Sequence, residues 1–130
     1  MKEFDDLLAI AKRKLNFDQN NLFSNGSTTY LAEMKKEIDE VLEEISQSRN
    51  CYLEEELVDV LWDYLNVLAA MEKETGINPQ AVLARACKKY DERVSGIEVG
   101  EFWENIKERQ KLRLAAEQKD YTKQKLQTDS

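Results

Sequence analysis

Residues 33–68 read EMKKEIDEVLEEISQSRNCYLEEELVDVLWDYLNVL, and their apolar residues recur at intervals of three and four. This spacing is typical of amphipathic α-helices. A polar break of six residues at 47–52 divides the pattern in two. Because short connections usually join antiparallel helices, the stretch predicts a helical hairpin.

Helical spacing continues on both sides of this hairpin. The predicted helices lie at 3–15, 29–46, 53–75, 79–94 and from Glu101 onward. One Pro, four Gly and many Leu, Glu, Lys and Ala also favour helix. We therefore predict the all-α fold class, as an antiparallel bundle of four to five helices in a single domain at 1–130.

Local signals mark the ends of these helices. Residues 16–28 (NFDQNNLFSNGST) read as a loop, and the expected N-cap of the next helix is Ser27 or Thr28. Gly76 is expected to end the third helix, because glycine adopts the left-handed conformation easily. Pro79 is expected at the first position of the fourth helix.

The C-terminal part of the chain differs in charge and pattern. A break is predicted at 95–100, before the fifth helical segment. Residues 107–125 carry seven Lys or Arg and three acidic residues, and the apolar spacing fades after Leu114. We therefore expect the residues from about 115 to 130 to form a frayed basic tail.

The composition excludes several classes of function. The 130 residues contain no His, which excludes His-based nucleophiles, His general bases and HExxH zinc sites. The net charge of −7 disfavours binding to a nucleic-acid polymer. Two cysteines are too few for a secreted disulfide framework, and no apolar run is long enough to span a membrane. Acids interrupt the apolar residues of the N-terminus, unlike in a signal peptide, so a cytoplasmic protein is expected.

Two pairs of acidic residues, Glu37 with Glu40 and Glu56 with Asp59, have the spacing i, i+3. On a helix this spacing places both carboxylates on one side. Residues 33–59 contain ten acidic and three basic residues, so the local charge equals the net charge of the chain. Such repulsion costs stability unless a cation compensates it, and Mg²⁺ prefers oxygen ligands. If the two helices are antiparallel, four carboxylates can converge, which predicts a Mg²⁺ site with Mn²⁺ as the alternative ion.

Helix 53–75 is apolar over more than half of its circumference, which is typical of a buried helix. The narrow polar strip of this helix consists of Glu56, Asp59, Asp63 and Asn66. Buried carboxylates need partners, so the second acidic pair is expected to be more deeply buried than the first and to require the metal most. A lone subunit of this size does not readily cover so much apolar surface, which predicts a homodimer or homotetramer.

The arrangement of ExxE, fifteen intervening residues and ExxD resembles the signature of the MazG-like, all-α nucleoside triphosphate pyrophosphohydrolases. The matching segments are Glu37-Ile38-Asp39-Glu40 and Glu56-Leu57-Val58-Asp59. The segment Lys89-Tyr90-Asp91-Glu92-Arg93 is similar to the family's later Lys-x-x-x-Arg element. The resemblance covers about 29–106, and dimeric dUTPases and phosphoribosyl-ATP pyrophosphohydrolases share this superfamily.

This resemblance implies Mg²⁺-dependent hydrolysis between the α- and β-phosphates of a nucleoside triphosphate, which releases the monophosphate and pyrophosphate. The residues that would hold the metal are Glu37, Glu40, Glu56 and Asp59. Glu40, at the edge of the apolar stripe, is the expected general base. Lys89 and Arg93 would neutralise the phosphates. Asp63 and Asn66, which extend the acidic strip along the helix, are candidates for contact with the ribose or base. The resemblance also implies a homo-oligomer.

Other interpretations remain open at this stage. The substrate range could be narrower, limited to dUTP or dCTP. Alternatively, the chain could be a non-catalytic helical oligomerisation module whose acidic residues are simply solvated. In the same way, Lys89 and Arg93 could form ordinary surface ion pairs with Glu residues.

Overall fold

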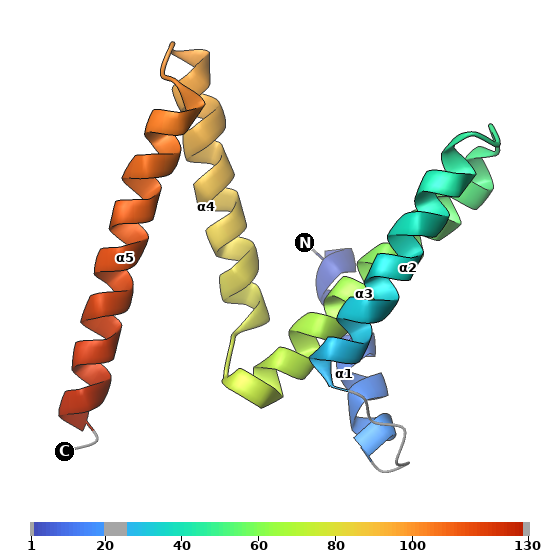
Figure 1. Ribbon diagram of the computed structural model, residues 1–130. Helices are drawn as coiled ribbons and strands as arrows, with labels where there is room; N and C mark the ends of the chain where they lie inside the picture. Colours follow the sequence, from blue (N-terminus) through green and yellow to red (C-terminus); the bar gives the residue numbers. More distant parts are fainter. Residues whose placement is uncertain (1, 20–25, 129–130) are drawn as a thin grey trace. The chain divides into compact units, whose positions relative to one another are not determined.

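The computed structural model describes residues 2–19 and 26–128, and these residues form helices and no strand. The helices are α1 (Lys2–Gln19), α2 (Ser27–Ile45), α3 (Asn50–Thr75), α4 (Pro79–Glu98) and α5 (Trp103–Thr128), as Figure 1 shows. The prediction of an all-α fold is therefore confirmed. The predicted loop at 16–28 is shorter than expected, since it is helical up to Gln19 and again from Ser27. The middle of that loop lies outside the described residues.

The helices belong to two compact units, Met1–Ala81 and Val82–Ser130. The first unit contains α1, α2 and α3, and the second contains most of α4 together with α5. The assignment of 1–130 to one domain stays a prediction.

The core of the first unit lies around α3, against which both α1 and α2 pack. From α1, Leu8, Ala11 and Leu15 are buried, at the spacing of one helical face. They are accompanied by the buried α3 segment 65–70. Burying a side chain of the size of Leu contributes about 1.5–3 kcal/mol, so this cluster is the main apolar support of α3.

The N-terminus of α2 is capped from a distant part of the chain. Ser27 or Thr28 was expected to be the N-cap, but Gly26 occupies that position and makes no side-chain cap. Instead, the backbone N–H and the hydroxyl of Ser27 both donate to the carboxylate of Glu74, each at 3.0 Å. A carboxylate at this end of a helix satisfies free N–H groups and complements the helix dipole. The contact therefore ties the start of α2 to the last turn of α3.

The signals between α3 and α4 act as predicted. Gly76 ends α3 in the left-handed region, with φ of 79°. The side chain of Asn78 then accepts hydrogen bonds from the N–H groups of Gln80 and Ala81, at 2.9 and 3.3 Å. Pro79 is the first residue of α4, where it loses no helical hydrogen bond.

In the second unit, α4 and α5 form an antiparallel hairpin (Figure 1). The break between them was predicted at 95–100, but α4 continues to Glu98 and α5 starts at Trp103. Fully buried Ile106 packs against Gly96, where an added Cβ would collide with the Ile106 side chain. Helix α5 continues to Thr128, so the residues expected to fray are helical up to that point, and all their side chains are exposed.

The prediction that α3 is buried on nearly all sides is wrong for the single chain. Leu57 and Val58 are each 50% exposed, and Leu61 is 44% exposed. The reason is that α1 covers only the C-terminal part of α3, while the hairpin of α2 and α3 extends past it (Figure 1). The hairpin therefore carries an exposed apolar set, which consists of Leu31, Ile38, Leu42, Ile45, Tyr52, Leu57, Val58, Leu61 and Tyr64.

Candidate metal centre

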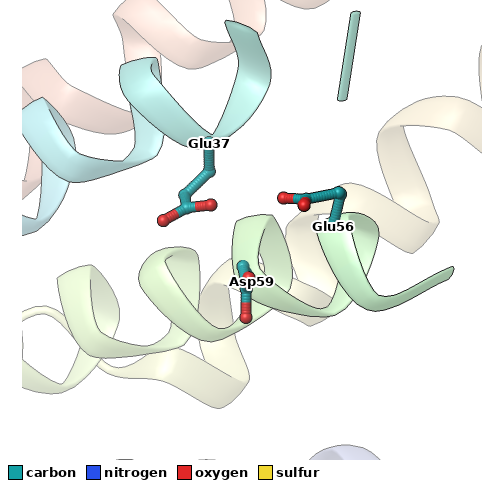
Figure 2. A group of neighbouring side chains, drawn as sticks. All are labelled: Glu37, Glu56 and Asp59. Carbon is teal, nitrogen blue, oxygen red and sulfur yellow. The ribbon is translucent and has the colours of Figure 1, made fainter. Parts of the chain in front are cut away.

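Three acidic side chains meet between α2 and α3. Glu37 comes from α2, and Glu56 and Asp59 come from successive turns of α3 (Figure 2). One carboxylate oxygen from each of the three lies within 4.8 Å of the other two. Oxygen ligands around one Mg²⁺ lie about 3–4 Å apart, so small side-chain rotations bring the three oxygens into one coordination shell. The antiparallel pairing thus joins residues that are up to 22 positions apart in the sequence.

Two oxygens of this cluster are shielded from water and lack a donor. Glu37 Oε2 and Glu56 Oε2 have almost no contact with solvent, and neither has a hydrogen-bond partner among the described residues. A carboxylate oxygen shielded from water without a donor is unfavourable. An oxygen-seeking cation satisfies both atoms at once, so the donor set fits Mg²⁺.

The raised pKa values of Glu37 and Glu56 also favour a bound cation. Desolvation, then the Glu40 carboxyl group within hydrogen-bond reach, and then the charges of Glu40, Asp59 and Asp63 raise the pKa of Glu37 from 4.5 to about 7. The pKa of Glu56 is raised in the same way, first by desolvation, then by the hydrogen-bond contact with Glu40, and then by the charges of Glu40, Asp59 and Glu44. The protein thus holds several like charges close together, at a cost that a bound cation removes.

Glu40 lies beside this cluster without joining it. The side chain is exposed, and Glu40 is not among the three residues whose oxygens converge. The raised pKa of both Glu37 and Glu56 nevertheless reflects the Glu40 carboxylate next to them. The structure therefore brings together three of the four predicted metal ligands and places the fourth, Glu40, at the edge of the group, within hydrogen-bond reach of Glu37 and Glu56.

The predicted difference in burial between the two pairs is wrong. Glu37 and Glu56 are both half-buried, whereas Asp59 and Glu40 are both exposed. Each pair therefore contributes one shielded and one open carboxylate. The cause is the same as for the apolar residues of α3, because α1 does not reach this part of the hairpin.

Asp63 and Asn66 extend the polar strip along α3, as predicted. Asn66 is 1% exposed, and its Nδ2 donates to the backbone carbonyl of Trp62 at 2.8 Å. Asp63 Oδ2 and Asn66 Oδ1 are buried and have no hydrogen-bond partner among the described residues. Burial raises the pKa of Asp63, and the charges of Glu33 and Asp59 add to the effect. A contact of either residue with substrate stays a prediction.

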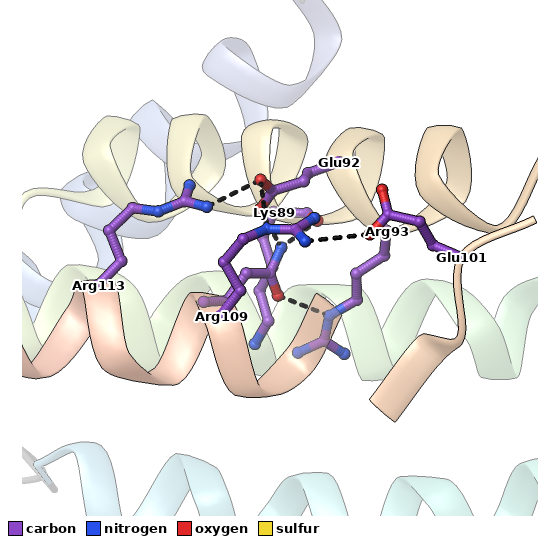
Figure 3. A network of polar contacts seen from close by, with 7 residues as sticks. Lys89, Glu92, Arg93, Glu101, Arg109 and Arg113 are labelled. Atoms are coloured by element: carbon purple, nitrogen blue, oxygen red, sulfur yellow. Dashed lines mark hydrogen bonds and ion pairs between the residues drawn. The ribbon is translucent and has the colours of Figure 1, made fainter. Parts of the chain in front are cut away.

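Lys89 and Arg93 lie in the second unit, in a polar network between α4 and α5 (Figure 3). Arg93 Nε donates to Gln110 at 2.8 Å, and the guanidinium lies 5.1 Å from the centroid of the Trp103 ring. The neighbouring Glu92 carboxylate accepts instead from Gln110 and from Arg113, at 2.8 and 2.9 Å. Within the part of the chain that the structure describes, Arg93 thus bonds to a neutral amide rather than to a carboxylate. That these cations lie near the acidic cluster of the first unit stays a prediction.

Two residues next to the cluster, Glu44 and Arg49, had no predicted role. Glu44 is buried and pairs with Arg49, which follows the turn between α2 and α3. The signal in the sequence is the position of Arg49, the sole basic residue between Lys36 and Lys73.

The binding of Mg²⁺ is expected to depend on pH through Glu37. The folded chain favours the neutral carboxyl, so its contribution to stability is complete below pH 4.5 and is lost as the pH rises through about 7. Metal binding requires the ionised form, so the apparent Mg²⁺ affinity should weaken by up to about tenfold per pH unit below 7. Calorimetric titration from pH 5.5 to 8 measures this slope. Glu37→Gln should flatten the slope, and an affinity independent of pH in the parent protein would contradict the expectation.

A comparison with protein-family models shows which family the chain belongs to. No helix in the described ranges combines the length and apolarity that a bilayer crossing demands. No curated protein and no solved structure matches the chain. The family model of the MazG nucleotide pyrophosphohydrolase domain matches residues 25–97, more than half of the chain, and this range includes both acidic pairs, Lys89 and Arg93. The chain therefore belongs to the MazG nucleotide pyrophosphohydrolase family.

Proposed function

We propose that the protein is a Mg²⁺-dependent pyrophosphohydrolase that converts a ribo- or deoxyribonucleoside triphosphate into the monophosphate and pyrophosphate. The observation that carries the proposal is the convergence of Glu37, Glu56 and Asp59, with two shielded oxygens that lack donors. Family membership supports the general reaction class. The three carboxylates would hold the ion, and Mn²⁺ has ligand preferences close enough to replace it.

The proposed reaction is one displacement at phosphorus. A water oxygen attacks the α-phosphorus, and the bond from that phosphorus to the α–β bridging oxygen breaks. The bridging oxygen leaves with pyrophosphate, and the nucleoside monophosphate gains the water oxygen. When bound, Mg²⁺ supplies positive charge beside the phosphate oxygens and makes a neighbouring water more acidic.

Glu40 is proposed to accept the proton of the attacking water. The carboxylate is exposed and lies next to the cluster, so a water molecule at the cluster can reach it. Glu40 is not one of the three residues that would hold the ion. A base that is also a metal ligand is less free to take a proton, which favours Glu40 over Glu37 for this role.

Lys89 and Arg93 are proposed to bind the phosphates. Arg93 uses only Nε in its bond to Gln110, so its two terminal nitrogens are available for a bidentate phosphate contact. Asp63 and Asn66, one to two turns along α3 from Asp59, are proposed to face the ribose or base.

A homodimer or homotetramer is proposed to cover the exposed apolar set of the hairpin. Leu42, which is 63% exposed, contributes little to the core of the single chain. Leu42→Glu should therefore preserve the helical fold but reduce the oligomer to a smaller species, because a charge in an apolar interface is unfavourable. Light scattering after size-exclusion chromatography measures the mass. Leu126→Glu, at a residue that is 67% exposed on α5, is the control; a monomeric parent protein would refute the proposal.

The function is tested by pyrophosphate release from a panel of canonical and modified (d)NTPs with Mg²⁺. Release from several nucleotides supports the general activity. Release confined to dUTP or dCTP identifies the narrower enzyme. No release from any nucleotide, together with no gain in melting temperature on addition of Mg²⁺, would identify a non-catalytic oligomerisation module. A cytoplasmic site of action is part of the same proposal.

A further inference from the structure

The turn between α2 and α3 holds an arginine in a fixed orientation. Arg49 Nε donates to Glu44 Oε2 at 3.1 Å, and Arg49 Nη2 donates to Glu44 Oε1 at 2.8 Å. Glu44 is 8% exposed, whereas the Arg49 side chain is 50% exposed, so a buried carboxylate positions a guanidinium that is open to solvent. The face of the guanidinium lies 4.2 Å from the centroid of the Tyr52 ring. One edge and one face of Arg49 are therefore occupied by protein.

The opposite edge of the guanidinium is open. A guanidinium has five N–H donors, and the two bonds to Glu44 use two of them. The remaining three belong to the fork of Nη1 and Nη2, which has no other hydrogen-bond partner among the described residues. This fork matches the geometry of two phosphate oxygens. Because Arg49 is already held in place, binding an anion would cost little additional side-chain entropy.

Arg49 lines a hollow at the edge of the acidic cluster. The other residues that line this hollow, of ≈ 420 Å³, are Glu40, Glu43, Glu44, Gln47 and Glu56. Glu40 and Glu56 belong to the proposed catalytic and metal-binding set, and Arg49 is the one cationic side chain in this lining. Four of the six lining residues are glutamates, so a polyphosphate that reaches the metal through this hollow finds a donor cation only in Arg49, and bound Mg²⁺ would have to offset the carboxylates. Arg49 is thus the group that can attract an anion to this side of the cluster.

We propose that Arg49 is a phosphate-binding residue, which presents its Nη1–Nη2 fork to the polyphosphate of the nucleotide while Glu44 and Tyr52 hold it in position. This inference rests on the proposed function. It adds a cation from the first unit, at the side of the cluster formed by the α2–α3 turn. Lys89 and Arg93 of the second unit keep their separate proposed role.

The test compares Arg49→Lys with Lys35→Ala in the full chain. Lysine keeps the positive charge beside Glu44, so the fold is maintained, but it lacks the fork. Lys35 is exposed on α2, about 200° around the helix from Glu37, so its loss changes charge away from the site. Arg49→Lys should weaken the calorimetric affinity for inorganic pyrophosphate with Mg²⁺ and raise KM for the best nucleotide by about tenfold or more, because charge-assisted hydrogen bonds are lost. Lys35→Ala should stay within about twofold in both measurements.

Tyr52→Leu provides a second variant that leaves Arg49 intact. Tyr52 is 59% exposed in the single chain, and leucine keeps the apolar side chain that the proposed oligomer would cover, so loss of the ring should weaken pyrophosphate binding by about two- to fivefold without loss of the fold. If the parent protein hydrolyses no nucleotide, the proposed function fails, but pyrophosphate binding still decides the role of Arg49. Equal pyrophosphate affinity in Arg49→Lys and Lys35→Ala, or no pyrophosphate binding by the parent protein, would overturn the inference.

Discussion

Replacement of Asp59 by Asn should reduce pyrophosphate release by roughly 10²- to 10⁴-fold, because metal stabilisation of the transition state is worth several kcal/mol. Asp59 is the exposed member of the group of three, so the loss of its charge should not disturb the core. The same substitution should abolish the gain in melting temperature that Mg²⁺ gives to the parent protein. Steady-state kinetics and thermal melts with and without Mg²⁺ measure the two effects.

Asp39→Asn is the matched control for this variant. Asp39 is exposed on α2 and is not part of the carboxylate group, so removal of its charge should leave both measurements near those of the parent protein. Full activity in Asp59→Asn would show that the converging carboxylates do not hold a catalytic metal. An equal loss of activity in both variants would indicate a general effect of charge.

Glu40→Gln should lower kcat by roughly 10²- to 10⁴-fold, which is the usual contribution of a general base. In contrast to Asp59→Asn, it should retain most of the stabilisation by Mg²⁺, because Glu40 lies outside the group of three oxygens. Steady-state kinetics together with thermal melts in Mg²⁺ separate the two roles of this carboxylate.

Glu55→Gln, which removes an exposed charge elsewhere on α3, is the control for Glu40. Loss of Mg²⁺ stabilisation in Glu40→Gln would make Glu40 a metal ligand, as the sequence alone predicted. Unchanged kcat in Glu40→Gln would require another base.

The helices were predictable where the signals are local. Apolar spacing, Gly76 and Pro79 identify the hairpin and the boundary between α3 and α4 from short segments of sequence. The cap of α2 was not predictable in this way, because Glu74 is 47 positions from Ser27 and reaches it only in the folded chain. The exposure of Leu57 was missed for a similar reason, since burial depends on how far α1 extends along α3.

The residues of the metal centre were predictable from the sequence, but which of their carboxylates converge was not. The spacing of the two acidic pairs and the short connection imply that they meet in an antiparallel hairpin. The stagger between α2 and α3 then decides which carboxylates converge, and it leaves Glu40 at the margin. Arg49 was missed because its partner Glu44 lies five residues earlier, across the turn, where helical spacing rules do not apply.

Hydrolysis in H₂¹⁸O of the nucleotide that the panel identifies as the best substrate tests the proposed reaction. With Mg²⁺ present, attack at the α-phosphorus predicts ¹⁸O in the nucleoside monophosphate and unlabelled pyrophosphate. Mass spectrometry of the two products locates the label. Label in pyrophosphate, or the appearance of a nucleoside diphosphate with inorganic phosphate, would contradict the proposed chemistry of the carboxylate cluster.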